Sequence, residues 1–275
     1  MSINTETILG SRETLRRYRH SASELTGEFY MDDITTIKSI YSGYFFHNHT
    51  GLTKVSLPNC TSIQTSNFFK GCTNLVEVEL PILAGNNNNL TNMFADCTSL
   101  KNIDLPKLTK MPNSLVSNCP SLERVCMLAV TGYVTQNQPL VGPLPEFQIL
   151  RVPKYSVQWG VKANDKSWAC PKMKLVDCGY TTIITENNSY SILRPAKILI
   201  FRRTSVPQLS DSNFKNGAAK KIYVPSSLIS QYQEETNWSA AYASGNVEFL
   251  PLEGSPYEDP DFDDTEIWNT PREEL

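Results

Sequence analysis

Few side chains in the sequence could do catalytic or metal chemistry, and their spacing does not converge. Only three of the 275 residues are histidines. His47 and His49 flank Asn48, and alternation along an extended segment could direct both imidazoles to one side. Two imidazoles still fall short of the three or four protein ligands of a zinc site. The sequence has no nucleophile elbow, phosphate-binding loop or zinc-protease motif. We therefore expect a non-enzymatic protein with no catalytic residues, no cofactor and no metal.

The acidic residues near the C-terminus are a second candidate for metal chemistry. Asp261, Asp263 and Asp264 superficially resemble the start of a calcium loop. The glycine and the closing glutamate of such a loop are not in their places. We interpret these carboxylates as part of an acidic tail.

The seven cysteines are the remaining reactive side chains. Cys72, Cys97 and Cys119 recur at intervals of 25 and 22 residues. The odd total argues against a complete disulfide framework, although a disulfide between neighbours in this series is sterically conceivable. Equivalent positions of stacked repeats form a line, whereas a tetrahedral zinc site needs converging ligands. We expect three buried, reduced and metal-free thiols, since free cysteine behaves as a small hydrophobic residue.

These cysteines belong to one pattern that is written four times between Tyr44 and Leu128. The leucines that anchor the copies are 23, 25 and 22 residues apart, and the copies cover residues 45–58, 68–81, 93–106 and 115–128. Each copy contains Leu-x-x-Val-x-Leu or a close variant, and the first three end in proline. A period of 20–29 residues with this strand is typical of a leucine-rich repeat.

The strand of each copy explains the repetition physically. The central Val or Ile and the final Leu are two residues apart, so they point to one face. Proline then ends the strand because it cannot donate to a ladder hydrogen bond. No repeat can bury this face alone, so neighbours must stack. The predicted fold is a repeat solenoid: a β-rich stack with a parallel sheet on one side and short helices and turns on the other.

The details of the pattern resemble one subtype, the bacterial BspA-like (Treponema-type) leucine-rich repeat. Its signature is aromatic-x-x-Cys-x-x-Leu-x-x-Ile-x-Leu-Pro, and residues 68–81 and 93–106 match it closely. His49 departs from the signature because it stands where the other copies have cysteine. The insertion from Gly85 to Asn89 lengthens one turn.

The outward strand positions of the repeats form a surface that could bind a partner. Parallel stacking places equivalent residues about 4.8 Å apart, and solenoids use such ribbons for extended recognition. An ordinary solvated sheet face is the alternative interpretation. The outward positions are Lys54, Ser56, Glu77, Glu79, Asn102, Asp104, Arg124 and Cys126.

After Leu128 the pattern loosens into a region that we interpret as degenerate repeats. Residues 131–145 are rich in Gly, Gln and Pro and indicate a loop or hairpin. Phe147–Pro153 restores the strand formula and is followed by Trp159, Trp168 and a strand-like stretch at 173–176. Ala196 to Phe201 is expected to add another strand.

A second strand, aromatic helix and returning strand follow at 222–250. This copy resembles a terminal segment of repeat proteins from Firmicutes, their phages and prophages, which implies that it closes the solenoid. The residues that carry the resemblance include Tyr232 and Trp238. Leu228, Ile229 and Tyr232 have helical spacing and should cover the last strand, with Trp238 capping the core. The other carrying residues are Asn213–Asn216, Lys221–Pro225, Asn237 and Ser239.

The two ends of the chain differ in charge. The chain has a net charge of −3; residues 253–275 contribute −8, which leaves +5 for the rest. This balance does not favour a nucleic-acid partner. The predicted organisation is an N-terminal attachment segment at 1–30 and leucine-rich repeats with an N-terminal cap at 31–128. Degenerate repeats with two strand-proline-aromatic-helix modules follow at 129–253, and an acidic tail at 254–275.

The basic cluster of the N-terminal segment could be a docking surface or a solvated helix face. It comprises Arg12, Arg16, Arg17, Arg19 and His20. Phe262 and Trp268 in the tail are expected to bind a neighbouring subunit, and packing back on the tail's own domain is the alternative. On the attachment hypothesis, deleting 254–275 would leave the melting temperature almost unchanged.

Three functions are compatible with these features. The first is a structural component of a bacteriophage particle in the tail, baseplate or fibre. It would contact other virion proteins through its termini, with a host receptor or glycan as a further partner. The alternative is a leucine-rich-repeat adhesin of the bacterial cell surface. An enzyme with a site at 129–150 is the least favoured. No stretch of about 18 apolar residues predicts a membrane span, and Met1–Thr7 does not resemble a signal peptide. The virion is therefore the predicted location.

Overall fold

The structure, a computed structural model, describes residues 3–4, 25–32, 34–38, 46–84, 90–133, 140–156, 170–184, 193–209, 217–243 and 245–275. These residues form two compact units, Met1–Leu144 and Pro145–Leu275, each described separately below. Several predicted features lie outside the described residues. They are the basic cluster of Arg12 to His20, the insertion at 85–89, Trp159, Trp168 and Asn213–Asn216.

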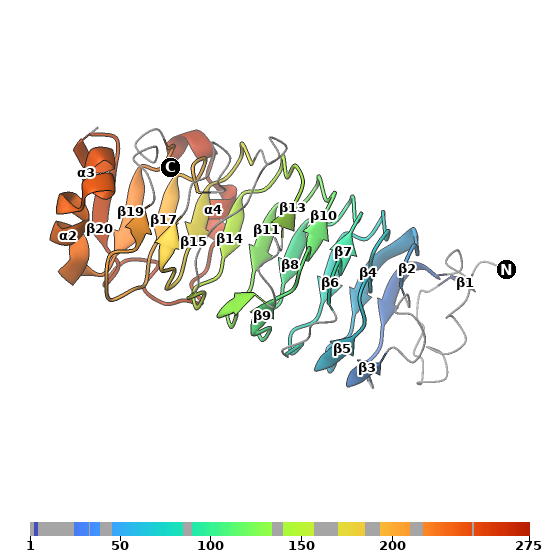
Figure 1. Cartoon of the computed structure of the whole chain (residues 1–275). Coiled ribbons are helices and arrows are strands. Elements are labelled where there is room, and N and C mark those ends of the chain that lie inside the picture. The colour runs from blue at the N-terminus through green and yellow to red at the C-terminus, as the bar shows by residue number, and fades with distance from the viewer. Residues whose placement is uncertain are drawn as a thin grey trace. The chain divides into compact units, whose positions relative to one another are not determined.

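The first unit is built on a parallel sheet with one strand from each repeat (Figure 1). The first four strands pair in the order β1-β2-β4-β6, and β8 pairs with β11. The amide of Lys101 donates to the carbonyl of Val76 at 3.3 Å and joins the turn of β8 to that of β6. The strands are β1 (Ile3–Asn4), β2 (Leu25–Tyr30), β4 (Gly51–Ser56), β6 (Glu77–Glu79), β8 (Asn102–Asp104) and β11 (Arg124–Cys126).

Shorter strands form further parallel rows in the same unit. One row has the order β13-β10-β7, and the others are the pairs β3–β5 and β9–β12. Each turn of chain therefore bonds to the equivalent turn of its neighbour. These strands are β3 (Thr36–Lys38), β5 (Ser62–Gln64), β7 (Phe94–Ala95), β9 (Lys110–Met111), β10 (Val116–Ser117), β12 (Gly132–Tyr133) and β13 (Leu140–Val141).

The core of the first unit follows the predicted register. Val55 pairs with Val78, and the repeat leucines, including Leu75 and Leu100, are fully buried. A second layer comes from aromatic residues, because Phe69 stacks between Phe46 and Phe94 with ring centroids 5.3 and 5.4 Å away. The predicted leucine-rich-repeat solenoid with parallel sheets is confirmed.

A tight turn before the cysteine position recurs in each repeat and was not predicted. Asn48, Gly71, Asp96 and Asn118 occupy this turn, and all have a positive φ between 54° and 75°. Only glycine and, less readily, Asn and Asp adopt this conformation at low cost. Asn118 Nδ2 also donates to Asp96 Oδ1 at 3.0 Å, which links two successive turns. The positive φ of this turn therefore explains why each repeat has Gly, Asn or Asp at this position.

The segment 1–30, predicted to lie outside the repeats, contributes a strand to the sheet. In β2, Leu25 and Phe29 are buried, and β2 pairs in parallel with β4. The pairing shifts register between Gly27 and Glu28. This irregularity breaks the simple spacing of apolar residues that marks the other repeats, which explains why the strand was assigned to the wrong segment.

The second unit continues the same construction with a parallel sheet in the order β14-β15-β17-β19-β20 (Figure 1). The pair β16–β18 forms a second row. Each main-sheet strand lies where a strand was predicted. The strands are β14 (Ile149–Arg151), β15 (Leu175–Asp177), β16 (Ile183–Ile184), β17 (Ile198–Ile200), β18 (Gln208–Leu209), β19 (Lys221–Val224) and β20 (Glu248–Pro251).

Helices η3 (Ser226–Leu228), α2 (Ile229–Glu234) and α3 (Thr236–Ala243) connect the last two sheet strands. Tyr232 and Trp238 are fully buried, and their rings lie 5.2 Å apart. Tyr232 contacts Phe249 of β20 at the same centroid distance. Trp238 Nε1 donates to the carbonyl of Pro207 at 2.9 Å. The aromatic residues Tyr232 and Trp238 of this module thus pack in the core of the second unit.

Candidate binding surface

The cysteine series is structural. The thiols of Cys72, Cys97 and Cys119 donate to the carbonyl oxygens of aromatic residues in the preceding repeat, at Sγ–O distances of 2.8, 3.1 and 2.9 Å. All seven cysteines are free and buried. Burial raises the pKa of Cys72 to about 12 and that of Cys119 to about 11. Protonated thiols are weak nucleophiles and poor metal ligands, so this series offers no reactive site.

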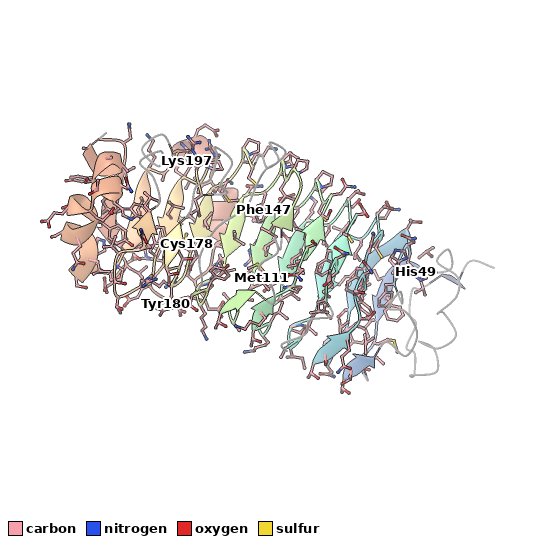
Figure 2. All side chains as sticks on the ribbon, in the orientation of Figure 1. His49, Met111, Phe147, Cys178, Tyr180 and Lys197 are labelled. Carbon is pink, nitrogen blue, oxygen red and sulfur yellow. The ribbon has the colours of Figure 1, made fainter. Side chains whose placement is uncertain are left out.

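His47, His49 and the acidic tail, which the structure describes, do not form a metal site either. His49 is buried at the cysteine position of the first repeat (Figure 2), whereas His47 is only partly buried. Asp263 Oδ1 accepts a hydrogen bond from the amide of Thr265 at 2.9 Å. Asp264 is buried and paired with an arginine. Among the described residues, no group of three His, Cys, Asp or Glu side chains could hold a metal ion.

Lys54 organises the charged side chains of the first unit's outward face. Its ammonium group lies 3.0 Å from Glu77 Oε1 and 2.6 Å from Glu79 Oε1, both on the adjacent strand β6. Hydrogen bonds from Lys54 and Ser56 lower the pKa of Glu79, and those to Glu79 and Glu77 raise the pKa of Lys54. Lys54 and Glu79 are therefore both charged at neutral pH.

A second charged group lies across β8 and β11. Arg124 Nη1 is 3.7 Å from Asp104 Oδ2, and Asn102 pairs in register with Arg124. Asn102 and Asp104 are exposed, whereas Cys126 at the equivalent outward position is buried. Ser56 is likewise buried. We call the six accessible predicted side chains the outward ribbon: Lys54, Glu77, Glu79, Asn102, Asp104 and Arg124.

The equivalent outward positions of the second unit have a different character. Ile149, Leu175 and Ile198 stand in register on adjacent strands, and two residues further along the register are Arg151, Asp177 and Ile200. All six side chains are buried. Apolar outward positions on a solenoid sheet require a cover, since they would otherwise be exposed to water.

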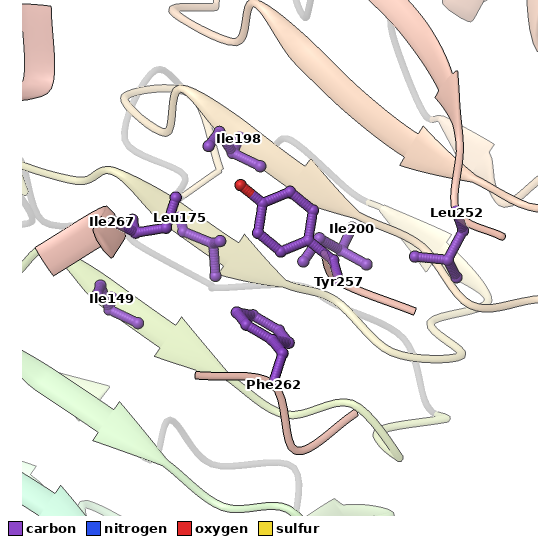
Figure 3. Close-up of a cluster of buried hydrophobic side chains, with 8 residues drawn as sticks. All are labelled: Ile149, Leu175, Ile198, Ile200, Leu252, Tyr257, Phe262 and Ile267. Atoms are coloured by element: carbon purple, nitrogen blue, oxygen red, sulfur yellow. The ribbon is translucent and has the colours of Figure 1, made fainter. Parts of the chain in front are cut away.

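The C-terminal segment supplies that cover. Leu252, Tyr257, Phe262 and Ile267 recur every five residues and join Ile149, Leu175, Ile198 and Ile200 in one buried cluster (Figure 3). Their exposed fractions are only 6–8%. The tail also includes α4 (Thr265–Asn269) and η4 (Arg272–Glu274). The tail therefore lies over the sheet, with the acidic residues Asp261 and Asp263 among those exposed to solvent.

Arginine and lysine side chains of the second unit bind the tail through its main-chain carbonyls and through one carboxylate. Arg151 Nη1 forms an ion pair with Asp264 at 3.0 Å, and its Nη2 donates to the carbonyl of Pro260 at 2.8 Å. The guanidinium carbon of Arg151 lies 3.9 Å from the ring centroid of Phe262. Lys174 Nζ donates to the carbonyl of Trp268 at 2.7 Å.

Arg202 is a further cationic side chain that binds the tail. Its guanidinium binds Asp177 through Nε and Nη2, with a shortest distance of 2.8 Å, and donates to the carbonyls of Tyr257 and Glu258. Asp177 is fully buried, so it requires a cationic partner. Arg202 thereby ties the buried carboxylate of β15 to the start of the tail.

This arrangement corrects the expectation that Phe262 and Trp268 bind a neighbouring subunit. Phe262 is buried against its own sheet, and Trp268 is partly buried beside the same cluster. The alternative, in which the tail packs back on its own domain, describes the structure. The five-residue recurrence of apolar residues in the tail, opposite Ile149, Leu175 and Ile198, was the signal that could have revealed the contact.

A comparison with protein-family models agrees with the repeat architecture. No described helix has the length and apolar character needed to cross a membrane. No curated protein matches the chain. One matching crystal structure is a leucine rich cell surface protein from Faecalibacterium prausnitzii A2-165, 15% identical over 89% of this chain and 81% of that chain, with a TM-score of 0.32. The family model of the BspA type leucine rich repeat region matches residues 25–136 in six copies. Residues 25–136 of this chain are therefore BspA-type leucine-rich repeats.

Proposed function

We propose that this protein is a non-enzymatic binding protein that recognises a macromolecule through the outward ribbon of its first unit. The observation that carries the proposal is the contrast between the two sheet faces. In the first unit the face presents exposed polar side chains such as Glu77, Asn102 and Asp104. In the second unit the corresponding face is closed by the chain's own tail.

The ribbon is suited to recognition because its charges are held in place before a partner arrives. Lys54 lies between two carboxylates of β6, and Arg124 faces Asp104 across adjacent strands. Such cross-strand pairs restrict the rotamers of long side chains, which lowers the ordering cost of binding. A rigid repeat backbone keeps the spacing of these groups fixed over several strands.

We propose the bacterial cell surface as the place of action, in the role of an adhesin. BspA-type repeats make up the first unit, and a binding role follows the use of solenoid faces in extended recognition. The expected attachment to other virion proteins used the tail as one of its two attachment points. Since Tyr257, Phe262 and Ile267 are buried in the second unit, the tail does not offer these side chains to another virion protein.

Binding assays with a ribbon variant test the proposal. Biolayer interferometry would measure the wild-type protein against immobilised glycans, extracellular polypeptides and fixed bacterial cells. The variant Glu77→Ala/Asn102→Ala/Asp104→Ala removes exposed side chains, and Asp261→Ala/Glu273→Ala is a matched control on the second unit. We expect the ribbon variant to lose about tenfold in affinity for any bound ligand and the control to match wild type. Equal binding by the two variants would place the site elsewhere.

The location is tested separately on cells of the source bacterium. Brief proteolysis of intact cells followed by mass spectrometry should release peptides of this chain, and a cytoplasmic enzyme serves as the lysis control. Detection of the chain in purified phage particles, and not among peptides released from the cell surface, would favour the virion instead.

A further inference from the structure

The outward face of the second unit has the construction of a site for a polypeptide segment. Its floor is an apolar row that includes Ile149, Leu175 and Ile198. Long cationic side chains rise from the same unit beside this row: Arg151, Lys174 and Arg202. Their donor groups meet main-chain carbonyls of the tail as well as one tail carboxylate.

The occupant of this face, the C-terminal tail, is connected to the sheet along the chain by one turn. Within the described residues, the tail follows the last sheet strand, β20, and adds no strand to the sheet. A turn at Leu252–Ser255, closed by the amide of Ser255 donating to the carbonyl of Leu252 at 3.1 Å, connects β20 to the tail. Gly254 in this turn has φ of 75°, is exposed and has no atom within 4 Å of its Cβ position. The chain therefore meets no steric obstacle to a change of direction at Gly254, while the amide of Leu252 stays bonded to the carbonyl of Val224 at 2.8 Å.

Without the tail, the outward face of the second unit would need another segment with apolar side chains and a carboxylate to cover it. Departure of the tail exposes the apolar row and leaves Arg151 without its carboxylate partner. The complementary segment that the sequence itself provides is the same tail from another molecule. Residues 253–275 carry a charge of −8 and the remainder of the chain +5, so long-range attraction favours the approach of a tail to a second body.

We propose that residues 256–275 exchange between two copies of this chain and form a reciprocal dimer in which each of these segments covers the sheet of its partner. Every contact between residues 256–275 and the sheet is kept in the exchanged form, so the two forms differ mainly in the turn at Leu252–Ser255. Exchange of an identical element is a low-cost route to a dimer, and protein concentration then sets the balance between monomer and dimer.

The ion pair between Arg151 and Asp264 provides a test by charge reversal. In the full chain, Arg151→Asp opposes its own Asp264, and Asp264→Arg opposes its own Arg151. Mixing the two variants makes both exchanged contacts complementary. The double variant Arg151→Asp/Asp264→Arg restores complementarity within one chain and is the control. Light scattering after size-exclusion chromatography would give the mass of each sample.

We expect the mixture to form a heterodimer, including from single variants that fold poorly alone, and the double variant to be mainly a monomer. Two results would overturn the proposal. One is a mixture that contains no heterodimer although the double variant folds. The other is single variants that are monomers with the melting temperature of wild type, because the ion pair would then not hold the tail.

A second measurement uses the wild-type chain and does not depend on the folding of any variant. Equal amounts of unlabelled and nitrogen-15-labelled protein are mixed at high concentration in mild denaturant, returned to buffer and analysed by native mass spectrometry. Tail exchange predicts dimers of intermediate mass that carry one labelled and one unlabelled chain. A spectrum that contains monomers alone at every concentration would contradict it.

Discussion

Arg151 and Asp264 lie 113 residues apart in the sequence and form an ion pair of 3.0 Å with side-chain exposures of only 2% and 10%. The pair joins a strand of the second unit's sheet to the C-terminal tail. It is accompanied by a contact of the same guanidinium with the ring of Phe262. The acidic tail is therefore an integral layer of the second unit, in spite of a composition that is typical of solvated chain ends.

The ion pair should contribute strongly to stability when only one partner is removed. Asp264→Ala leaves a buried guanidinium without its counterion, and the expected loss is about 3–5 kcal/mol in the free energy of unfolding. Denaturant unfolding of Arg151→Ala, Asp264→Ala and the double variant would measure the coupling. The exposed pair of Lys54 and Glu77 is the control, where Glu77→Ala should cost less than about 1 kcal/mol. Similar losses at the two sites would show that the tail pair is solvated.

The apolar anchors of the tail should matter as much as its charge. Phe262→Ala removes a buried ring from the cluster around Ile149 and Leu175, and large-to-small changes of this kind cost about 3–5 kcal/mol. Deleting 254–275 should lower the melting temperature markedly, whereas the free-tail hypothesis expected almost no change. Differential scanning calorimetry would compare both with Glu273→Ala, which alters an exposed side chain. An unchanged melting temperature for the deletion would mean that the tail does not cover the sheet in solution.

The sequence predicted those parts of the fold whose buried residues recur at a regular spacing along the chain. The burial of Leu75 and Leu100 follows from spacing alone, because each repeat must bury the same face. The register shift in β2 interrupts that spacing and concealed a strand at residues 25–30. The ion pair of Arg151 with Asp264 spans 113 residues and has no local signature, so only the five-residue recurrence of apolar residues in the tail indicated a contact.

The sequence predicted which strand positions point outward, but it did not predict which of those side chains are exposed to solvent. Glu77 and Asp104 are accessible as expected, whereas Ser56 and Cys126 are buried at equivalent outward positions. Accessibility depends on the neighbours that cover a side chain, and alternation along a strand does not reveal those neighbours. Composition was misleading for Phe262 in the same way, because the apolar partners of the tail lie on distant strands.

The repeat register is tested by truncation of a core leucine. Leu100 is fully buried in the first unit, and Leu100→Ala should cost about 2–5 kcal/mol. Lys101 is the next residue and is exposed, with an ion pair to Glu123 at 3.7 Å. Lys101→Ala should therefore change the free energy of unfolding by less than about 1 kcal/mol in the same urea titration. A loss below about half a kcal/mol for Leu100→Ala would mean that the register is wrong.

The cysteine series predicts a loss of stability at alkaline pH. Burial raises the pKa of Cys72 from its ordinary value of 9.0 to about 12. Below pH 9 the thiol is protonated in both the folded and the unfolded states, and its stabilising contribution is complete. Between pH 9 and about 12 only the unfolded state releases the proton, so this contribution declines as pH rises.

Urea unfolding between pH 7 and 11 would measure this decline, with Cys72→Ala as the matched variant. The variant should show a shallower loss at alkaline pH than wild type, whatever its stability at pH 7. In parallel, thiol titration of the native protein at pH 8 should detect none of Cys72, Cys97 and Cys119, and denaturation should expose them. Identical pH slopes or rapid native titration would contradict the buried, protonated series.

The central claim is that the outward face of the first unit is open and that of the second is closed by the chain's own tail. Carbodiimide labelling of carboxylates in the full-length protein, quantified by mass spectrometry, tests it most directly. Glu77 and Asp104 should be modified rapidly, whereas Asp177 and Asp264 should stay protected until the protein unfolds. Modification of Asp177 and Asp264 at the rate of Glu77 would show that the second face is open as well, and would contradict this assignment of the binding surface.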